Sequence, residues 1–195
     1  MNAKKAFIRS AVIICIAVLS VFFGIIVQSF TDRAERAKYP LAFEEFVNKY
    51  SYEYGVPKNV IYAYIKCSSD FKGDLTSDGG EIGLMQVSPK LLEKYKEELH
   101  DPYDAGMLYD PETNIKYGTY HLSKIYLKVG TWRAVYASLA AGVDRVTEWL
   151  VDERYAEIGE LAKPKLKVIP DEAASRYADL LEKTAEKYNK LYFEN

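Results

Sequence analysis

The chain of 195 residues is long enough for a membrane segment and one globular domain, since a domain usually takes about 100–200 residues. Its side chains are 49% hydrophobic, which is enough for a packed core and excludes a disordered polar chain. The formal net charge of -2 shows no excess of basic residues, so we do not expect nucleic acid as a partner.

The first apolar segment predicts a transmembrane helix. Residues 10–30 carry no charged side chain, and this length suffices to cross the hydrocarbon core as a helix. Lys4, Lys5 and Arg9 precede it, so the positive-inside rule predicts a cytoplasmic N-terminus at residues 1–9 and an extracytoplasmic C-terminal domain. A cleaved signal peptide shares this layout. We favour a retained, single-pass anchor in the cell membrane, because the apolar core exceeds the usual length of about 7–15 residues.

The remaining sequence predicts a short tether followed by one helical domain. Residues 31–39 are charged and read as the tether, and Pro40 is compatible with the first position of a helix that begins the domain 40–195. Apolar residues at helical spacing, and the cap signals beside them, predict a mainly α-helical fold. The expected helices cover about residues 43–54, 57–68, 89–99, 110–129, 132–150 and 171–192, and the Gly- and Asp-rich segment 70–81 is expected to be a loop. Either Asp110 or Thr113 supplies the cap of the fourth helix.

The segment 65–89, IKCSSDFKGDLTSDGGEIGLMQVSP, carries the most specific pattern in the chain. It resembles the active-site segment of the transglycosylase SLT domain family, lysozyme-like lytic transglycosylases that cleave the glycan strands of bacterial peptidoglycan. That family has an Ile-Lys-x-Glu-Ser-x-Phe stretch, a loop, and a Ser-x-x-Gly-Ala-x-Gly-Leu-Met-Gln run. The matching residues here are Ile65, Lys66, Ser69, Phe71, Ser77, Gly80 and Gly83-Leu84-Met85-Gln86. The resemblance covers about residues 40–193 and implies a lysozyme-like helical domain with a small loop or β-hairpin segment.

The position of the family's catalytic Glu is occupied by Ser68. Glycosidic cleavage needs a carboxylic acid that protonates the leaving oxygen, and a serine hydroxyl cannot replace it at neutral pH. The resemblance therefore implies that no intact catalytic residue is present. Glu81 and Asp70 are the fallback acids, with Glu81 preferred, although a solvated surface carboxylate is the favoured interpretation of both. The two histidines, His100 and His121, have no metal-ligand spacing with cysteine or with each other, so neither a metal nor another cofactor is expected.

Two other polar positions of the family's cleft have also changed. Aligned through the Ala-Gly pair at 141–142, this chain has Leu139 and Ala140 where the family has Tyr-Asn. Near the C-terminus Ala173 and Ala174 stand where the family has Glu-Thr, although Tyr177 is retained. Loss of three separate polar positions favours a fold that was kept after catalysis ceased.

Sugar binding remains an open expectation. The resemblance assigns substrate binding to Ser77, Met85, Gln86 and Tyr177, and Tyr64 and Tyr120 are further candidates for stacking on sugar rings. The competing interpretation is that these tyrosines are half-buried core residues and that Gln86 only holds the loop together.

Three hypotheses follow. The first is a catalytically inactive pseudoenzyme that binds peptidoglycan glycan strands or serves as a scaffold for other cell-envelope proteins. The second is an active or weakly active lytic transglycosylase that uses Glu81 or Asp70. The third is a protein-interaction domain without sugar affinity. A cleft filled by Leu139 and its neighbours favours the third hypothesis, whereas an open groove beside Ser68 favours the first two.

Overall fold

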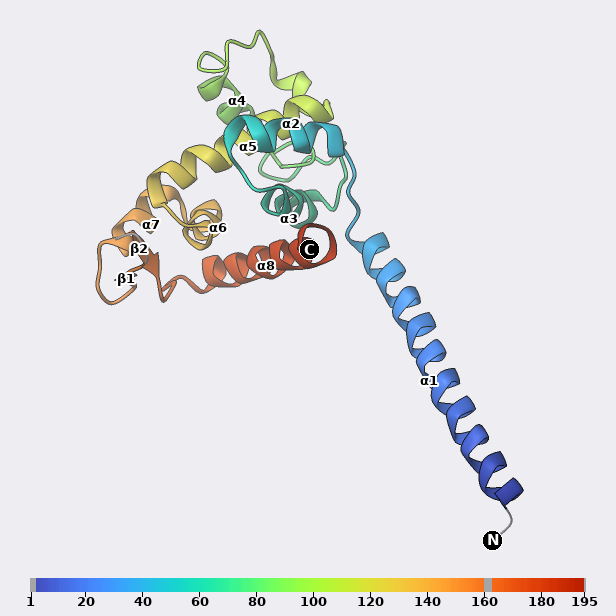
Figure 1. Cartoon of the computed structure of the whole chain (residues 1–195). Helices are drawn as coiled ribbons and strands as arrows, with labels where there is room; N and C mark the ends of the chain where they lie inside the picture. Colours follow the sequence, from blue (N-terminus) through green and yellow to red (C-terminus); the bar gives the residue numbers. More distant parts are fainter. Residues whose placement is uncertain (1–2, 160–162, 195) are drawn as a thin grey trace. The chain divides into compact units, whose positions relative to one another are not determined.

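The computed structural model describes residues 3–159 and 163–194, and the chain divides into two units, Met1–Pro40 and Leu41–Asn195 (Figure 1). Met1 and Asn2, at the start of the predicted cytoplasmic segment, lie outside the described residues.

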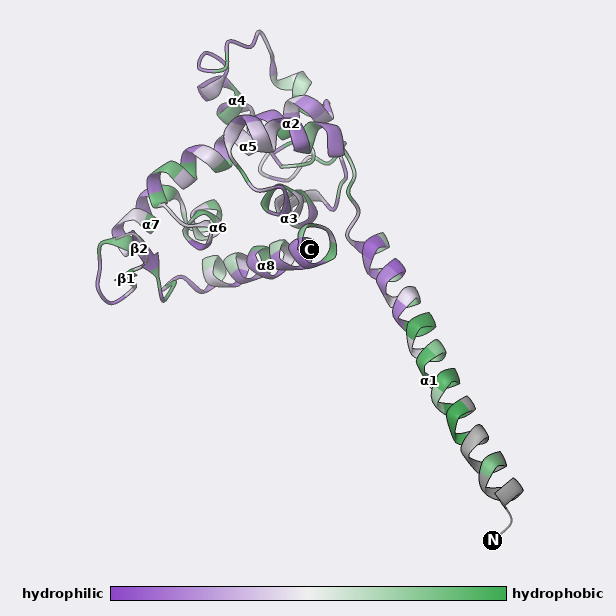
Figure 2. Cartoon of the chain, viewed as in Figure 1, coloured by the Kyte–Doolittle hydropathy of each residue, from purple (hydrophilic) through white to green (hydrophobic). Residues whose placement is uncertain are grey.

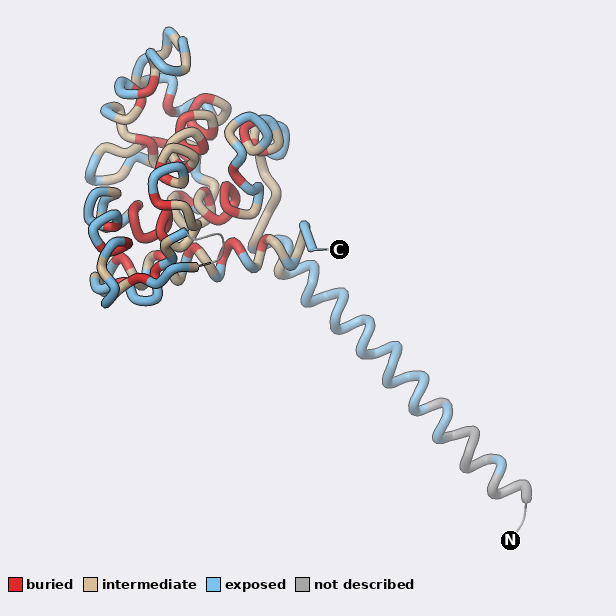
Figure 3. The backbone as a smooth tube through the Cα atoms, turned by 60° about the vertical axis from the view of Figure 1, so that its left-hand side comes forward, coloured by how far each residue is buried: buried red, intermediate tan, exposed pale blue. Residues whose placement is uncertain are grey.

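The first unit is one long helix, α1 (Ala3–Lys38). Within the described residues, Ile16–Lys38 is long and apolar enough to cross a membrane, with a mean hydropathy of 1.4 in its most apolar window. Figure 2 shows that the apolar stretch gives way to hydrophilic residues in the last turns of α1, and Figure 3 colours most of its described residues as exposed. The Oγ atoms of Ser20 and Ser29 donate to carbonyls one turn back, at 2.8 and 2.9 Å, so neither hydroxyl is left unpaired.

The charged stretch 31–39, predicted to be a tether, is helical as far as Lys38. The helix continues through the charged residues to Lys38, because this stretch contains Ala, Arg, Glu and Lys and neither Gly nor Pro. Pro40 ends the helix rather than beginning the next one, and it disfavours a helical conformation for the residue before it.

The second unit is mainly α-helical, as predicted (Figure 1). Its elements are α2 (Glu44–Tyr54), α3 (Lys58–Ser69), α4 (Pro89–Tyr95), the 3-10 helix η1 (Ala105–Tyr109), α5 (Pro111–Val129), α6 (Trp132–Ala141), α7 (Val143–Leu150), β1 (Ala156–Ile158), β2 (Pro164–Leu166), α8 (Glu172–Tyr188) and the π-helical turn η3 (Asn189–Phe193). Asp110, not Thr113, caps α5, since its Oδ2 accepts from the backbone N–H of Thr113 at 2.8 Å.

Three predicted boundaries differ from the structure. The helix expected over 132–150 is broken into α6 and α7 at Gly142, whose φ of 89° and ψ of 147° are incompatible with a helix. The helix expected to reach Leu99 ends at Tyr95. The regular hairpin is formed by β1 and β2, paired antiparallel with Ala156 opposite Leu166, whereas the loop 70–81 and its flank contain only isolated bridges.

The core lies between α3, α5, α6 and α8, and the buried backbone runs through the middle of this unit (Figure 3). α8 packs against both α3 and α6, and α5 packs against α2 and α6. The fully buried side chains include Ile61, Ile65, Leu84, Ile115, Leu122, Val135 and Leu181. Ile65 and Leu84 belong to the motif segment, so the segment is anchored in the core by these side chains.

The side chain of Asn114 fastens the motif loop to α5. Its Oδ1 accepts from the backbone N–H of Met85 at 2.7 Å, and its Nδ2 donates to the carbonyls of Ile82 and Leu108, each at 2.7 Å. Asn114 is 1% exposed, so water cannot replace these partners. One amide therefore bonds to three backbone groups, two in the motif loop and one in η1.

We expect Asn114→Ala to lower the free energy of unfolding by about 2–4 kcal/mol, because the N–H of Met85 and the carbonyl of Leu108 lose their partner, while the carbonyl of Ile82 keeps the N–H of Val87. Denaturant unfolding followed by tryptophan fluorescence measures this. Asn59→Ala is the matched control, since Asn59 makes one longer bond, 3.3 Å to the carbonyl of Ala185, and should cost about 1 kcal/mol or less. Equal losses in the two variants would contradict the role given to Asn114.

Candidate functional site

An open groove of about 390 Å³ lies beside the motif segment. It is bordered by α3, the loop that precedes α4, and helices α4 to α7, with the lining residues Tyr64, Glu81, Met85, Gln86, Val87, Ser88, Leu91, Gly118, His121, Ile125, Ser138, Leu139, Gly142 and Val143. The groove therefore collects side chains from segments far apart in the sequence. Its walls combine apolar surface with hydroxyl, amide, imidazole and carboxylate groups, a mixture suited to a polar organic ligand.

The loop beneath the groove keeps its shape through close backbone packing. A Cβ atom built on Gly118 would lie 2.6 Å from the Sδ of Met85, so only glycine allows α5 to approach the loop this closely. Gln86 has a φ of 48°, and its Nε2 donates to the carbonyl of Gly83 at 2.7 Å and to that of Leu75 at 3.2 Å. These contacts hold the loop in a left-handed bend that the backbone alone disfavours.

Ser68 lies in the last turn of α3, half-buried between two tyrosines. Burial raises the pKa of the Tyr64 phenol, the proximity of Tyr177 raises it further, and a hydrogen bond with Ser68 opposes the rise. Burial likewise raises the pKa of Tyr177, against a hydrogen bond with Ser68. Ser68, Tyr64 and Tyr177 therefore form a cluster of three hydroxyls that stay protonated at neutral pH, with no carboxylate among them.

Glu81 lines the groove, and its surroundings stabilise the charged carboxylate. It accepts a hydrogen bond from the Oγ of Ser77, and its own N–H donates back to that Oγ at 3.1 Å. The hydrogen bond from Ser77 lowers the pKa of Glu81 below its usual value. A general acid for glycosidic cleavage needs a raised pKa, so this environment acts against that role.

The side chain of Asp70 does not line the groove and is paired with Lys66. Asp70 caps the end of α3 in a left-handed conformation, forms an ion pair with Lys66 that lowers its pKa, and its side chain is 61% exposed. It is not among the residues that line the groove. Of the two predicted fallback acids, the structure brings only Glu81 to the groove.

The predicted sugar-binding residues divide into two groups. Met85 and Gln86 line the groove, although Met85 is nearly fully buried and the Gln86 amide nitrogen is bonded to the backbone. Ser77 is bonded to Glu81, and Tyr177, which is not among the lining residues, is hydrogen-bonded to Ser68. Of the two stacking candidates, Tyr64 lines the groove, whereas Tyr120 packs edge-on against Tyr54 and Tyr95.

His121 is a groove residue that the sequence analysis did not assign. Its Nδ1 lies 3.2 Å from the hydroxyl of Tyr95, and burial lowers its pKa to about 4, with the positive charge of Lys94 as the second cause. The imidazole is therefore neutral at physiological pH. Its spacing of three and four residues from Gly118 and Ile125 along α5 was the available signal, because these three residues share one helix face.

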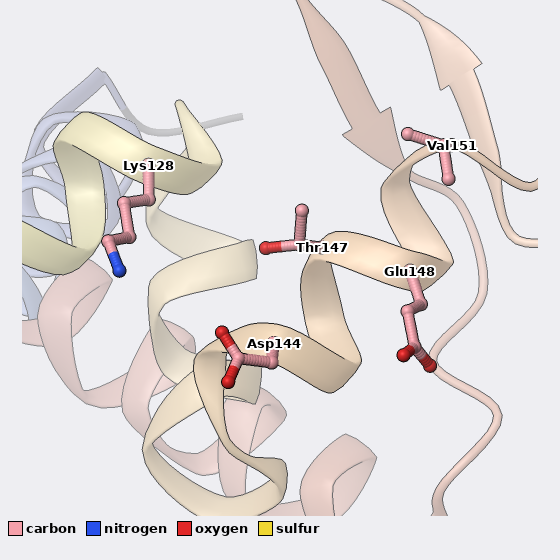
Figure 4. A pocket seen from close by; sticks show the side chains of 5 residues that line it. All are labelled: Lys128, Asp144, Thr147, Glu148 and Val151. Carbon is pink, nitrogen blue, oxygen red and sulfur yellow. The ribbon is translucent and has the colours of Figure 1, made fainter.

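A second, shallower depression of about 550 Å³ lies on the surface around α7 (Figure 4). Its lining residues are Lys128, Asp144, Thr147, Glu148 and Val151, whose polar groups point in different directions. No buried titratable group faces this depression among the described residues, so it is a weaker candidate than the groove.

The protonation of His121 predicts a loss of stability in mild acid. Its pKa is about 4 in the folded chain against 6.5 ordinarily, so the unfolded chain takes up the proton first and stability falls as the pH drops from about 6.5 towards 4. Between pH 7 and pH 5 we expect a loss of about 2 kcal/mol in the free energy of unfolding from this group. His121→Gln should remove this part of the pH dependence, measured by denaturant unfolding at both pH values. His100→Gln, on an exposed residue, should retain it, and an unchanged slope in His121→Gln would refute the assignment.

Sequence comparison relates this chain to the transglycosylase SLT domain. The model of the transglycosylase SLT domain matches residues 45–161, more than half of the chain. The soluble lytic murein transglycosylase of Escherichia coli is 32% identical over 117 residues, which cover 58% of this chain and 18% of that protein. The membrane-bound lytic murein transglycosylase E of Buchnera aphidicola is 26% identical over 147 residues, 69% of each chain. This chain thus spans about a fifth of the length of the soluble relatives and about two thirds of the membrane-bound one.

Solved structures show the same fold. The 70 kDa soluble lytic transglycosylase of Escherichia coli superimposes with a TM-score of 0.70 at 24% identity, over 82% of this chain and 26% of that one. An inactive mutant of the lytic transglycosylase Slt from Pseudomonas aeruginosa gives 0.69 at 24% identity, over 80% and 25%. The chain therefore belongs to the transglycosylase SLT domain family, with a lysozyme-like helical domain.

Proposed function

We propose that this protein is a membrane-anchored, catalytically inactive member of the SLT family that binds the glycan strands of peptidoglycan. The observation that carries the proposal is the open groove lined by Tyr64, whose phenol is hydrogen-bonded to Ser68, and by no carboxyl group with the raised pKa that a glycosidic acid needs. Among the residues that line it, Glu81 is the single acidic side chain.

Cleavage of a glycan requires proton transfer, whereas binding of a glycan requires only hydrogen bonds and contact, so binding can remain when cleavage is lost. A lytic transglycosylase must protonate the glycosidic oxygen and then remove a proton from the attacking hydroxyl, and both steps need one group that changes its protonation state. The hydroxyls of Ser68, Tyr64 and Tyr177 keep their protons at neutral pH, and Glu81 keeps its charge. The same groups can still exchange hydrogen bonds with sugar hydroxyls.

The groove argues for glycan binding rather than for a purely structural domain. Leu139, at the position of the family's Tyr, lines the groove without filling it, and the space remains open at about 390 Å³. Tyr64 offers an aromatic surface for a sugar ring, and Ser88, Gln86 and His121 bring polar groups to the walls. The relatives are lytic murein transglycosylases by name, which supports murein as the ligand.

The N-terminal helix supports anchoring at the membrane. Ile16–Lys38 has the length and composition of a membrane-spanning helix, and a relative of matching length is membrane-bound by name. We infer that α1 is a retained anchor whose basic N-terminal end lies in the cytoplasm, which places the groove outside the membrane. A scaffold role toward other envelope proteins is compatible with this arrangement.

The first experiment is the incubation of purified sacculi with the full chain in detergent micelles, followed by mass spectrometry for anhydromuramyl products and by a pull-down assay for binding. We expect binding to the sacculi and no anhydromuramyl product, since no group in the groove can act as the acid. Anhydromuramyl product from the unmodified chain would contradict catalytic inactivity, and absence of binding would contradict glycan recognition.

The alternative that Glu81 acts as the acid has its own test, because Glu81 does face the groove. If the unmodified chain releases product, Glu81→Gln should abolish at least about 99% of it, in line with the factor of about 10²–10⁴ that general acid catalysis contributes. Asp70→Asn is the matched control, since Asp70 lies outside the groove and is paired with Lys66. Product release that survives Glu81→Gln would exclude this residue as the acid.

A further inference from the structure

An apolar hollow lies where the C-terminal end of α5, helix α7 and strand β2 meet. It has a volume of about 380 Å³, and Leu127, Leu150, Val151 and Pro164 are among the apolar residues in its wall. Among the described residues none lines both this hollow and the groove, so the two are separate sites. We call it the hairpin hollow, because β2 of the β1–β2 hairpin borders it.

Three large aliphatic side chains protrude from the surface around the hairpin hollow. Leu127 is 79% exposed and Val151 is 80% exposed, and both line it. Ile158 is 75% exposed and pairs across the hairpin with Pro164, so its side chain lies on the same face of the hairpin as this lining residue. Single exposed aliphatic residues are common, but a group of them around one apolar hollow marks an interaction site.

The polar rim of the hairpin hollow is basic. Lys128 and Lys163 line it, and no carboxylate does so among the residues that the structure describes. Within residues 3–159 and 163–194 neither lysine forms an ion pair. Asp144 and Glu148 line the adjoining depression, and in Figure 4 their side chains point away from that of Val151. The hollow therefore offers two ammonium groups, neither engaged in an ion pair, beside apolar surface.

The chain between α1 and α2 is short. Residues 39–43 separate the end of α1 at Lys38 from the start of α2 at Glu44. On the proposed anchoring of α1, the helix extends about 12 Å beyond Phe30, where the apolar segment ends, at about 1.5 Å per residue. The domain therefore stays close to the bilayer, and this tethering raises the effective concentration of lipid at any surface of the domain that can reach it.

We propose that the hairpin hollow docks the domain onto a bilayer that contains anionic phospholipid. This inference rests on the proposed membrane anchor and is independent of glycan binding. The lysines bind headgroup phosphates, and Leu127, Val151 and Ile158 enter the boundary between headgroups and acyl chains. Docking would restrict the orientations that the anchored domain can adopt.

The pattern fits a bilayer better than a folded partner protein. A stable protein interface buries about 800 Å² on each partner, whereas the apolar group here consists of protruding side chains beside one small hollow. A bilayer has no fixed shape to match, so protruding aliphatic side chains flanked by lysines can bind it through few contacts. A weak intrinsic affinity suffices, because the anchor already holds the domain near the surface.

The test uses the full chain, one copy per lipid nanodisc, in discs of phosphatidylcholine alone and in discs of equal parts phosphatidylcholine and phosphatidylglycerol. Lysine accessibility is measured as the rate of reaction with acetic anhydride, a neutral reagent, followed by mass spectrometry. We expect Lys128 and Lys163 to react about fivefold more slowly in the anionic discs. Lys58, an exposed residue at the start of α3 and outside the hollow, should react at the same rate in both.

A double variant separates the hollow from a general effect of charge. Leu127→Ser/Val151→Ser removes two exposed side chains, so the fold should be retained and the protection of both lysines lost. The matched control Tyr52→Ser/Leu180→Ser removes exposed hydrophobic side chains outside the hollow and should keep the protection. Protection that survives Leu127→Ser/Val151→Ser would overturn the docking proposal.

Gel filtration of the same discs separates failure of docking from failure of the anchor. In high salt the chain should still elute with the discs, as a membrane-spanning helix requires. Co-elution with unprotected lysines would overturn docking and leave the anchor intact. Elution apart from the discs in high salt, with protection at low salt, would contradict the anchor and support docking, whereas no association at either salt concentration would overturn both. Protection seen only with two chains per disc would assign the hollow to a second copy of the chain and overturn lipid docking.

Discussion

The arrangement of the groove depends on one buried amide. Asn114 reaches from the first turns of α5 to three backbone groups in the motif loop and in the segment before α5. Because it is nearly inaccessible to water, each of these bonds replaces a desolvation cost that would otherwise fall on a loop with little regular structure. Gly118, one turn later on α5, allows the loop to lie directly against the helix. The position of the loop at residues 82–86 depends on these contacts.

The residues that give the groove its shape are different from those that could transfer a proton. The contacts that hold the loop are made by an asparagine, a glycine and the amide of Gln86, none of which has to exchange a proton. Ser68 lies on a different element, α3, where the core is built from Ile61 and Ile65. On the proposed assignment of Ser68 to the family's acid position, a change from acid to hydroxyl there leaves the packing of the fold in place, and fold similarity to a transglycosylase is then no evidence of cleavage.

The electrostatics of the groove favour fixed protonation states. Glu81 is held as an anion by the hydroxyl of Ser77, and His121 is held neutral by burial and by the nearby charge of Lys94. A catalytic acid requires the opposite arrangement, a carboxyl group whose neutral form is favoured by its surroundings. These fixed protonation states favour hydrogen bonding over proton transfer, in keeping with the proposed binding of a neutral sugar.

The sequence by itself determined the family, the helical class, most helix positions and the apolar N-terminal segment, because helical spacing, caps and the Gly-Leu-Met-Gln run are local patterns. It did not determine the break at Gly142 or the continuation of α1 to Lys38, since both depend on competing local preferences. Only the tertiary structure decided that Glu81 faces the groove while Asp70 does not, and that His121 belongs to its wall. Those facts depend on how α3, α5 and the loop meet in space; the spacing along α5 places His121 on one face with Gly118 and Ile125 but does not show that this face borders a groove.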